Sequence, residues 1–397
     1  MADFRPSDPG DLATILTWAA EETQPLELLG RGTKRVLGRP VEAAHILDLS
    51  KLSGIGVYEP AELVLTAGAA TPLAEIEATI GAAGQMMAFE PPDWGPLLGK
   101  EAQGQSLGGV LSCNLAGPRR LKMGAARDHL LGFSAINGRG EAFKAGGKVV
   151  KNVTGYDLPK LLCGSYGTLA ALTEVTIKVL PRPEEDSTLL ILGLDDRQAI
   201  AAMTEALNSP HEISAAAHLP ASCADLVPGA GGSVTALRVE GPKPSVAARV
   251  AALRVLLGRY GELADLAGDR IWRDIGDARP FVGLADRAVW RVSLAPSAGA
   301  ALVEDLQREL DLRHFYDWGG GLVWLGVAGA ADGGARALRA SLKGQGHATL
   351  IRGAEALRRE VPVFEPLAPG LAALTRRVKA GFDPRGILNP GRLYGDM

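Results

Sequence analysis

Alternating apolar and polar residues along the chain predict its first β-strands. Val175, Ile177 and Val179 alternate with polar residues, which is the two-residue period of a half-buried strand. Short apolar runs at 46–49 and 63–66 predict two more strands nearby in the sequence. The first part of the chain is therefore expected to mix short strands with helices.

A middle region lies between two proline-rich segments, 180–186 and 362–369, which we interpret as domain boundaries. Its apolar pattern predicts strands near 188–194, 212–219, 233–240, 288–294, 313–318, 321–328 and 347–352, and helices near 196–208, 245–258, 297–310 and 332–343. The implied order β-α-β-β-α-β, met twice, is that of a ferredoxin-like unit. We predict an α+β protein with domains at 1–183 and 184–365, and a C-terminal segment, 366–397, that returns to the first domain.

Composition narrows the class of protein. The chain has 397 residues, of which 47% are hydrophobic and 22% charged, a globular balance. A net charge of −3 argues against a nucleic-acid partner. Three widely spaced cysteines, Cys113, Cys163 and Cys223, offer neither a disulfide framework nor an iron–sulfur motif, which fits a reducing compartment. We find no signal peptide, and the longest nearly apolar run, 319–331, falls short of the ~18 residues that span a bilayer.

Several familiar ligand motifs fail in this sequence. The loop at 30–35 starts like GxGxxG, but Arg35 stands where the third glycine belongs. Two Gly-Lys pairs are followed by Glu101 and Val149 instead of serine or threonine, so a P-loop is unsupported. The six histidines are scattered, and we predict no metal site.

Glycine-rich loops and local charge indicate an anionic ligand. Residues 100–151 contain nine Lys or Arg against three acids, a local charge of +6 in an acidic chain. Loops rich in small residues occur at 106–109, 114–117, 122–124, 152–157 and 164–168. Bare backbone amides in such loops bind pyrophosphate well. Taken singly, each glycine could be an ordinary turn; together the loops favour a dianionic ligand.

The order and spacing of these segments resemble a known family of flavoproteins. The segments are 30–34, 89–93, 106–109, 149–158, 164–169 and 382–392, with weaker similarity at 317–320 and 346–349. They resemble the p-cresol methylhydroxylase (PCMH) and vanillyl-alcohol oxidase superfamily, most nearly the FAD-binding subunits of bacterial glycolate oxidases. The resemblance implies a PCMH-type FAD-binding domain of two α/β subdomains and a ferredoxin-like α+β cap.

The resemblance also implies which residues bind FAD. The first loop would place backbone amides on the pyrophosphate, 106–109 with 114–117 would form a second phosphate wall, and the C-terminal Asn389 and Arg392 would reach the isoalloxazine. The candidate FAD-binding residues are Arg31, Gly32, Thr33, Lys34, Pro92, Ser106, Gly108, Gly109, Asn114, Gly117, Asp128, Gly155, Tyr156, Asp157, Gly164, Gly167, Thr168, Val175, Asn389 and Arg392. Some members of the superfamily hold FAD covalently through a histidine in the first loop. This loop has none, so we predict non-covalent FAD.

Candidates for catalysis are fewer. Related hydroxy-acid-oxidising subunits carry a histidine-rich metal motif that this sequence lacks. The remaining candidates are His347 and Arg352, with His314 and Arg291 as weaker alternatives, and a structural role competes with the catalytic one for each. The catalytic site is therefore expected either here or in a partner subunit.

The resemblance implies an assembly that oxidises glycolate, a 2-hydroxy acid, to glyoxylate. Its other members would be a larger FAD subunit and an iron–sulfur subunit that accepts electrons. The protein is expected in the cytoplasm, or at the inner face of the plasma membrane through its partners alone. Two alternatives stay open: a self-sufficient FAD-dependent oxidase or dehydrogenase of another hydroxy acid or alcohol, and a non-catalytic scaffold that keeps the flavin fold.

Overall fold

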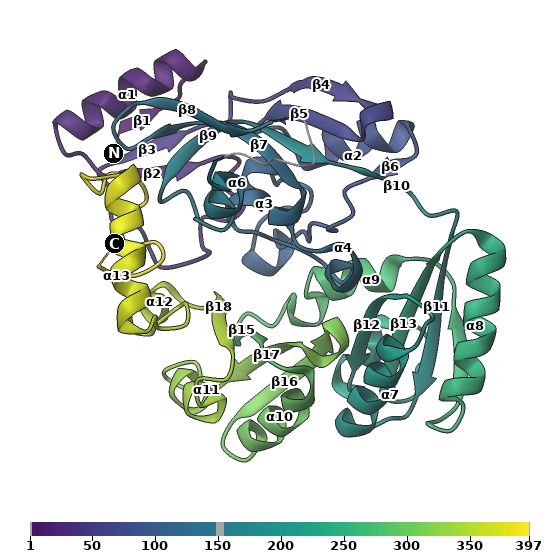
Figure 1. Ribbon diagram of the computed structural model, residues 1–397. Helices are drawn as coiled ribbons and strands as arrows, with labels where there is room; N and C mark the ends of the chain where they lie inside the picture. Colours follow the sequence, from purple (N-terminus) through teal and green to yellow (C-terminus); the bar gives the residue numbers. More distant parts are fainter. Residues whose placement is uncertain (1, 148–154, 397) are drawn as a thin grey trace. The chain divides into compact units, whose positions relative to one another are not determined.

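Two units of structure share the chain (Figure 1). The computed structural model describes residues 2–147 and 155–396. The first unit comprises 1–115, 124–182 and 366–397, and the second comprises 116–123 and 183–365. The segment 116–123 thus belongs to the second unit although residues on both sides of it belong to the first.

A small parallel sheet opens the first unit. Its strands, in the order β1-β3-β2, are β1 (Ala2–Phe4), β3 (His45–Asp48) and β2 (Leu26–Leu29). Helix α1 (Pro9–Glu21) begins at Asp8, whose carboxylate accepts hydrogen bonds from the amides of Gly10 and Asp11 at 2.8 and 2.9 Å. Near the C-terminus, Leu388 bridges to Leu26 in the parallel sense. The C-terminal segment therefore extends the sheet that begins the chain.

A larger antiparallel sheet completes the first unit. Its order is β4-β5-β9-β7-β8, and the strands are β4 (Ile55–Glu59), β5 (Val64–Gly68), β7 (Leu130–Asn137), β8 (Ala142–Gly146) and β9 (Ala170–Lys178). The remaining elements of the unit are α2 (Leu73–Ala82), β6 (Gln85–Met86), α3 (Leu107–Ser112), α5 (Ala126–His129), α6 (Leu158–Leu162), β10 (Leu180–Pro181) and α13 (Pro369–Phe382). Val175 and Ile177, predicted from their alternation, are fully buried on β9.

The second unit is built around one sheet with the order β14-β11-β13-β12-β16-β17-β15-β18. Its first half is β11 (Glu185–Leu192), α7 (Asp196–Asn208), β12 (Ile213–Leu219), β13 (Val234–Gly241), α8 (Lys243–Leu257) and β14 (Leu263–Leu266); its second half is β15 (Ala288–Ser293), α10 (Gly299–Gln307), β16 (Asp311–Asp317), β17 (Leu322–Ala328), α11 (Ala335–Leu342) and β18 (His347–Arg352). Short helices α4 (Arg120–Met123), α9 (Arg270–Gly276) and α12 (Glu355–Glu360) complete the unit. Each half is a β-α-β-β-α-β unit, which confirms the predicted pair of ferredoxin-like halves.

Helices α7, α8, α10 and α11 pack against the sheet, and a single apolar core runs through both halves. This core contains Leu189, Ile191 and Leu237 from the first half and Trp290 and Leu325 from the second, all fully buried. The shared core explains why two repeats form one unit.

A cluster of polar side chains lies where the two halves meet. Only His218 and Tyr316 pair between β12 and β16 in the described sheet. Asp196, in the first turn of α7, accepts a hydrogen bond from the Tyr316 hydroxyl at 2.7 Å, and its carboxylate lies 2.8 Å from His314 Nε2 and 3.3 Å from His218 Nε2. Burial alone would raise the pKa of Asp196, but the contacts with His218 and His314 outweigh it and hold that pKa well below its usual range.

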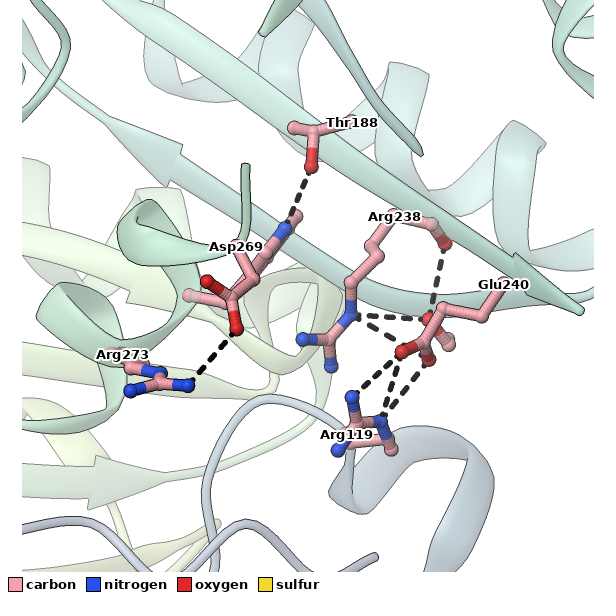
Figure 2. Close-up of polar contacts among 8 residues, drawn as sticks. Arg119, Thr188, Arg238, Glu240, Asp269 and Arg273 are labelled. Atoms are coloured by element: carbon pink, nitrogen blue, oxygen red, sulfur yellow. Dashed lines mark hydrogen bonds and ion pairs between the residues drawn. The ribbon is translucent and has the colours of Figure 1, made fainter. Parts of the chain in front are cut away.

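A buried ion pair attaches segment 116–123 to the second unit (Figure 2). Arg119 Nη2 lies 2.6 Å from Glu240 Oε1 on β13, and both side chains are buried. Arg238 lies 3.7 Å from the same carboxylate and donates from Nε to Ser214 Oγ at 3.2 Å. Burial works to raise the pKa of Glu240, yet the two guanidiniums lower it overall. Breaking such a buried pair is strongly destabilising, since one charge is left without its partner.

Candidate functional site

The first unit contains a cavity of about 110 Å³. Six stretches of chain line it: the end of β2 with the loop after it, the residue after β3, the residues after β5, helix α3 with its flanking residues, the segment leading into β9, and the C-terminal segment. Its lining includes Leu28, Leu29, Gly30, Arg31, Gly32, Thr33, Lys34, Arg35, Ser106, Gly108, Gly109, Ser112, Cys113, Tyr166, Gly167, Asn389 and Arg392. The two glycine-rich segments proposed as phosphate walls therefore face one cavity.

Polar contacts fix the conformation of the first loop, 30–35. Arg31 donates from Nε to the Gly104 carbonyl at 2.9 Å. Arg35 forms a bidentate ion pair with Glu27 on β2, with N···O distances of 2.6 and 3.0 Å. The Arg35 amide also closes a turn on the Gly32 carbonyl at 3.3 Å. The backbone of the loop is therefore shaped by the protein itself, which lowers the entropy cost of ordering it around a ligand.

Lys34 brings a partly buried positive charge to this cavity. Its ammonium group donates to Gln105 Oε1 at 2.9 Å and lies 3.5 Å from Thr33 Oγ1. A side chain placed at Gly109 would begin 4.0 Å from Lys34 Nζ, so the charge lies beside the first turn of α3. Burial lowers the pKa of Lys34, partly offset by Cys113 and Asp93. Among the described residues no carboxylate lies at hydrogen-bond distance from this partly buried ammonium, which suits an anionic ligand.

Three glycines of the cavity wall have no room for a side chain. A Cβ at Gly30 would lie 2.9 Å from Ser106 Oγ, and one at Gly108 would lie 2.7 Å from the Ala69 carbonyl oxygen. At Gly167, where φ is +70°, a Cβ would lie 2.8 Å from Asn389 Nδ2. The backbones thus approach each other closely around the cavity. This cradle, together with Lys34, fits the pyrophosphate of a dinucleotide cofactor.

The C-terminal segment closes another side of the cavity. Asn389 accepts from the Leu28 amide and donates to the Tyr166 carbonyl, both at 2.8 Å. Arg392 donates to the carbonyls of Arg35 and Leu37 at 2.7 and 3.1 Å. The C-terminal residues therefore position the first loop as well as line the cavity.

Lys379 on α13 anchors the same segment. Its buried ammonium donates to Asp383 Oδ2 at 2.6 Å and to the carbonyls of Thr168 and Leu388 at 2.7 and 3.0 Å. Asp383 in turn accepts from the Leu388 amide at 2.8 Å. Burial lowers the pKa of Lys379, although Asp383 opposes that shift.

Half of the candidate FAD-binding residues line the cavity, and the others lie elsewhere in the described chain. Those at the cavity are Arg31, Gly32, Thr33, Lys34, Ser106, Gly108, Gly109, Gly167, Asn389 and Arg392. Those elsewhere are Pro92, Asn114, Gly117, Asp128, Gly155, Tyr156, Asp157, Gly164, Thr168 and Val175. The motif residues 149–154 lie outside the described residues.

Local contacts account for several residues of the second group. Asn114 accepts from the Arg127 amide at 3.1 Å, Asp128 accepts from the Ala125 amide at 2.9 Å, and Asp157 caps α6. Tyr156 is 90% exposed. Gly117 belongs to the second unit, where its carbonyl accepts from Trp318 Nε1 at 3.1 Å.

The candidate catalytic residues lie in the second unit. His347 is exposed at the start of β18. Arg352 ends the same strand, and its guanidinium donates to the carbonyls of Phe281, Leu284 and Arg287. His314 lies in the Asp196 cluster, and Arg291 lies 4.7 Å from the Trp318 ring centroid. These contacts give Arg352 and His314 structural roles.

The prediction from sequence missed two polar residues, one beside the cavity and one in its lining. Gln105, which binds Lys34, directly precedes the predicted segment 106–109 and had no glycine to draw attention to it. Cys113, which is absent from the candidate FAD-binding residues, lines the cavity, and burial raises the pKa of its thiol to about 11. Over residues 2–147 and 155–396, no group of three or more His, Cys, Asp or Glu side chains could hold a metal ion.

No helix within the described part of the chain combines the length and the apolar character needed to cross a membrane.

The cavity and fold define a class of protein, the FAD-linked oxidoreductases. The family described as FAD binding domain matches residues 2–146. The chain is 37% identical over 380 residues to glycolate oxidase subunit GlcE of Escherichia coli (strain K12), an alignment that covers 96% of this chain and 95% of that protein. The chain therefore belongs to the family of glycolate oxidase subunit GlcE, and both the predicted family and the predicted cofactor, FAD, are confirmed.

Another relative and two solved structures are also similar to this chain. Glycolate oxidase subunit GlcD of Bacillus subtilis (strain 168) is 31% identical over 192 residues, covering 48% of this chain and 39% of that protein. The crystal structure of p-cresol methylhydroxylase has a TM-score of 0.76 at 14% identity, covering 99% of this chain and 88% of that one. A 4-ethylphenol oxidase from Gulosibacter chungangensis has a TM-score of 0.72 at 15% identity, covering 99% and 89%. These structures confirm the PCMH-type fold.

Proposed function

We propose that this chain is the FAD-binding subunit of a complex that oxidises glycolate to glyoxylate. The observation that carries the proposal is the similarity to GlcE along nearly the whole length of both proteins. The cavity of the first unit, with its partly buried Lys34 and close-packed glycine loops, supports it independently.

We assign FAD binding to 1–183 and the C-terminal segment 366–397, with 184–365 as a cap on the substrate side. When bound, FAD supplies the acceptor for the two electrons that leave the hydroxy acid with two protons. Lys34 would hold the negative charge of the pyrophosphate, and the backbone of 106–109 would form the adjoining wall. Asn389 and Arg392 would hold the first loop in position against the cofactor.

We further propose that the partners are a larger FAD subunit and an iron–sulfur subunit, which receives the electrons. These partners would keep the assembly in the cytoplasm or at the inner face of the plasma membrane. His347 remains the better catalytic candidate of this chain, because Arg352 is engaged with three backbone carbonyls. A partner subunit would carry the main hydroxy-acid site if His347 proves dispensable.

The test is an anaerobic visible spectrum of the isolated chain and of the co-expressed assembly, each before and after addition of glycolate. Bleaching of the flavin bands in the assembly alone would place the hydroxy-acid site in a partner. Bleaching in the isolated chain would support its own site, to be checked with the variant His347→Gln. An assembly whose flavin stays oxidised with glycolate, but bleaches with another hydroxy acid or alcohol, would overturn the proposed substrate.

A further inference from the structure

Helix α13 carries apolar side chains on an exposed face. Leu371 is 51% exposed and Leu374 is 52% exposed, and the partly buried Val378 follows one turn later. Their spacing of three and four residues aligns them along one side of the helix. We call these three residues the α13 stripe.

The helix behind the stripe is firmly attached to its own unit. Lys379, one residue after Val378, donates to Asp383 and to the carbonyls of Thr168 and Leu388 from a buried position. The stripe is therefore presented by an anchored helix and not by a frayed chain end. An ordered apolar surface of this kind loses little conformational entropy when a partner covers it.

The charge on α13 limits what could cover the stripe. Pro369–Phe382 contains Arg376, Arg377 and Lys379 and no acidic residue. Lys379 is buried against Asp383, and Arg376 pairs with Asp396. Arg377 is exposed and follows Leu374 by three residues, so the two side chains are neighbours on the helix surface. The stripe thus has a basic border.

We propose that the α13 stripe is a docking surface for another protein subunit that presents an apolar patch with an acidic rim. The inference rests on the proposed function, in which this chain works within an assembly. A second copy of this chain is disfavoured as the occupant, because a paired α13 would bring its own basic residues and no acid of its own, and the nearby Asp396 is already paired with Arg376. Leu371 and Leu374 would be the central anchors, and Arg377 would select the partner through charge.

Three variants test the surface, with co-expressed large flavin and iron–sulfur subunits as the probe. Leu371→Glu/Leu374→Glu and Arg377→Glu alter the stripe. Val255→Glu is the matched control, since Val255 is an isolated apolar residue on α8 that is 86% exposed. Folding is checked by FAD content and the midpoint of thermal unfolding, both of which should match wild type.

We expect the double variant to weaken assembly at least about ten-fold, Arg377→Glu to weaken it less and in a salt-dependent way, and Val255→Glu to leave it unchanged. Affinity is measured by titration and by native mass spectrometry. Assembly of the double variant with wild-type affinity would overturn the inference while leaving the proposed function intact. A wild-type homodimer that the double variant abolishes would assign the stripe to a second copy instead. Failure of the wild-type chain to bind either subunit would remove the proposed complex and this surface together.

Discussion

Lys34 donates a hydrogen bond to Gln105 at 2.9 Å, so that its partly buried ammonium links the first loop to the segment before α3. Both residues belong to stretches that line the cavity or border it, and neither has an acid at hydrogen-bond distance in the described contacts. The lysine is thus held by a neutral partner, which leaves its charge available to a bound anion.

Replacing Lys34 by Met should weaken FAD binding about 10- to 100-fold, as expected for losing a charged hydrogen bond. Because burial lowers the pKa of Lys34, affinity of the wild-type protein should also fall as the pH rises through that lowered pKa. Fluorescence titration of the apoprotein between pH 7 and pH 10 measures both effects. Lys100→Met, at an exposed position, is the control. Equal affinities of Lys34→Met and Lys100→Met would exclude this role.

Replacing Asn389 by Ala should destabilise the protein by about 1–3 kcal/mol, since the Leu28 amide and the Tyr166 carbonyl would each lose a partner. FAD content should fall as well, because Asn389 lies at the cavity. Urea unfolding and the flavin-to-protein absorbance ratio are the measurements. Asn208→Ala, at the exposed end of α7, should change neither. Unfolding of Asn389→Ala at the wild-type urea midpoint would contradict the bridging role.

Replacing Cys113 by Ser should leave stoichiometric FAD in place. Burial raises the pKa of the thiol to about 11, so the thiolate that would attack a flavin is scarce at neutral pH. Precipitation of the wild-type protein with acid should release all yellow colour into the supernatant. Colour that stays in the pellet of the wild type, but not of Cys113→Ser, would show a covalent link.

Asp196→Asn should lower stability at pH 7 by about 1–3 kcal/mol, since it weakens the cluster that joins the two halves of the second unit. The folded protein holds the pKa of Asp196 below the reference value of 3.8, so this stabilisation is present above that value and is lost as the pH falls through the lowered pKa. Thermal unfolding of both proteins between pH 2 and pH 8 should show the difference shrinking in acid. A difference that persists undiminished at pH 2 would assign it to packing instead.

Asp186→Asn, in contrast, should raise the stability of the folded protein at neutral pH. Burial raises the pKa of Asp186 to about 6, despite the nearby Arg238, so the ionised carboxylate destabilises the folded state above that pH. Because the side chain is partly exposed, we expect a gain of about 1 kcal/mol at pH 7.5, disappearing below about pH 4. Thermal unfolding at these two pH values checks it. Lower stability of Asp186→Asn at pH 7.5 would mean that attraction to Arg238 exceeds the cost of burial.

Hydrophobic periodicity was enough to predict the second unit, because its repeated strands and helices bury residues such as Leu189 and Ile191 in a regular order. It did not predict β14, whose four residues are only partly buried or exposed. The site was predictable at positions such as Gly108 and Gly167, where a neighbouring segment lies so close that only glycine fits.

Long-range contacts explain what the sequence could not reveal. Arg119 and Glu240 are 121 positions apart, and no local pattern indicates that segment 116–123 would join the second unit and take Gly117 with it. In the same way, Asp157 lies in a glycine-rich segment and Asp128 follows another by a few residues, yet each accepts a hydrogen bond from a nearby backbone amide. Short polar side chains in turns serve such local bonds as readily as they serve a ligand.

Because segment 116–123 belongs to the second unit, two cuts in the chain are not enough to separate the units. Neither unit is a continuous stretch of chain, so cutting at 183 and 365 would remove Arg119 from Glu240 and leave that carboxylate with Arg238 as its remaining guanidinium. A chimera that exchanges the second unit between related proteins would need a second graft, at 116–123, to bring the matching arginine. The same requirement applies to recombination during evolution. We therefore expect the two units to be inherited together and not exchanged separately between proteins.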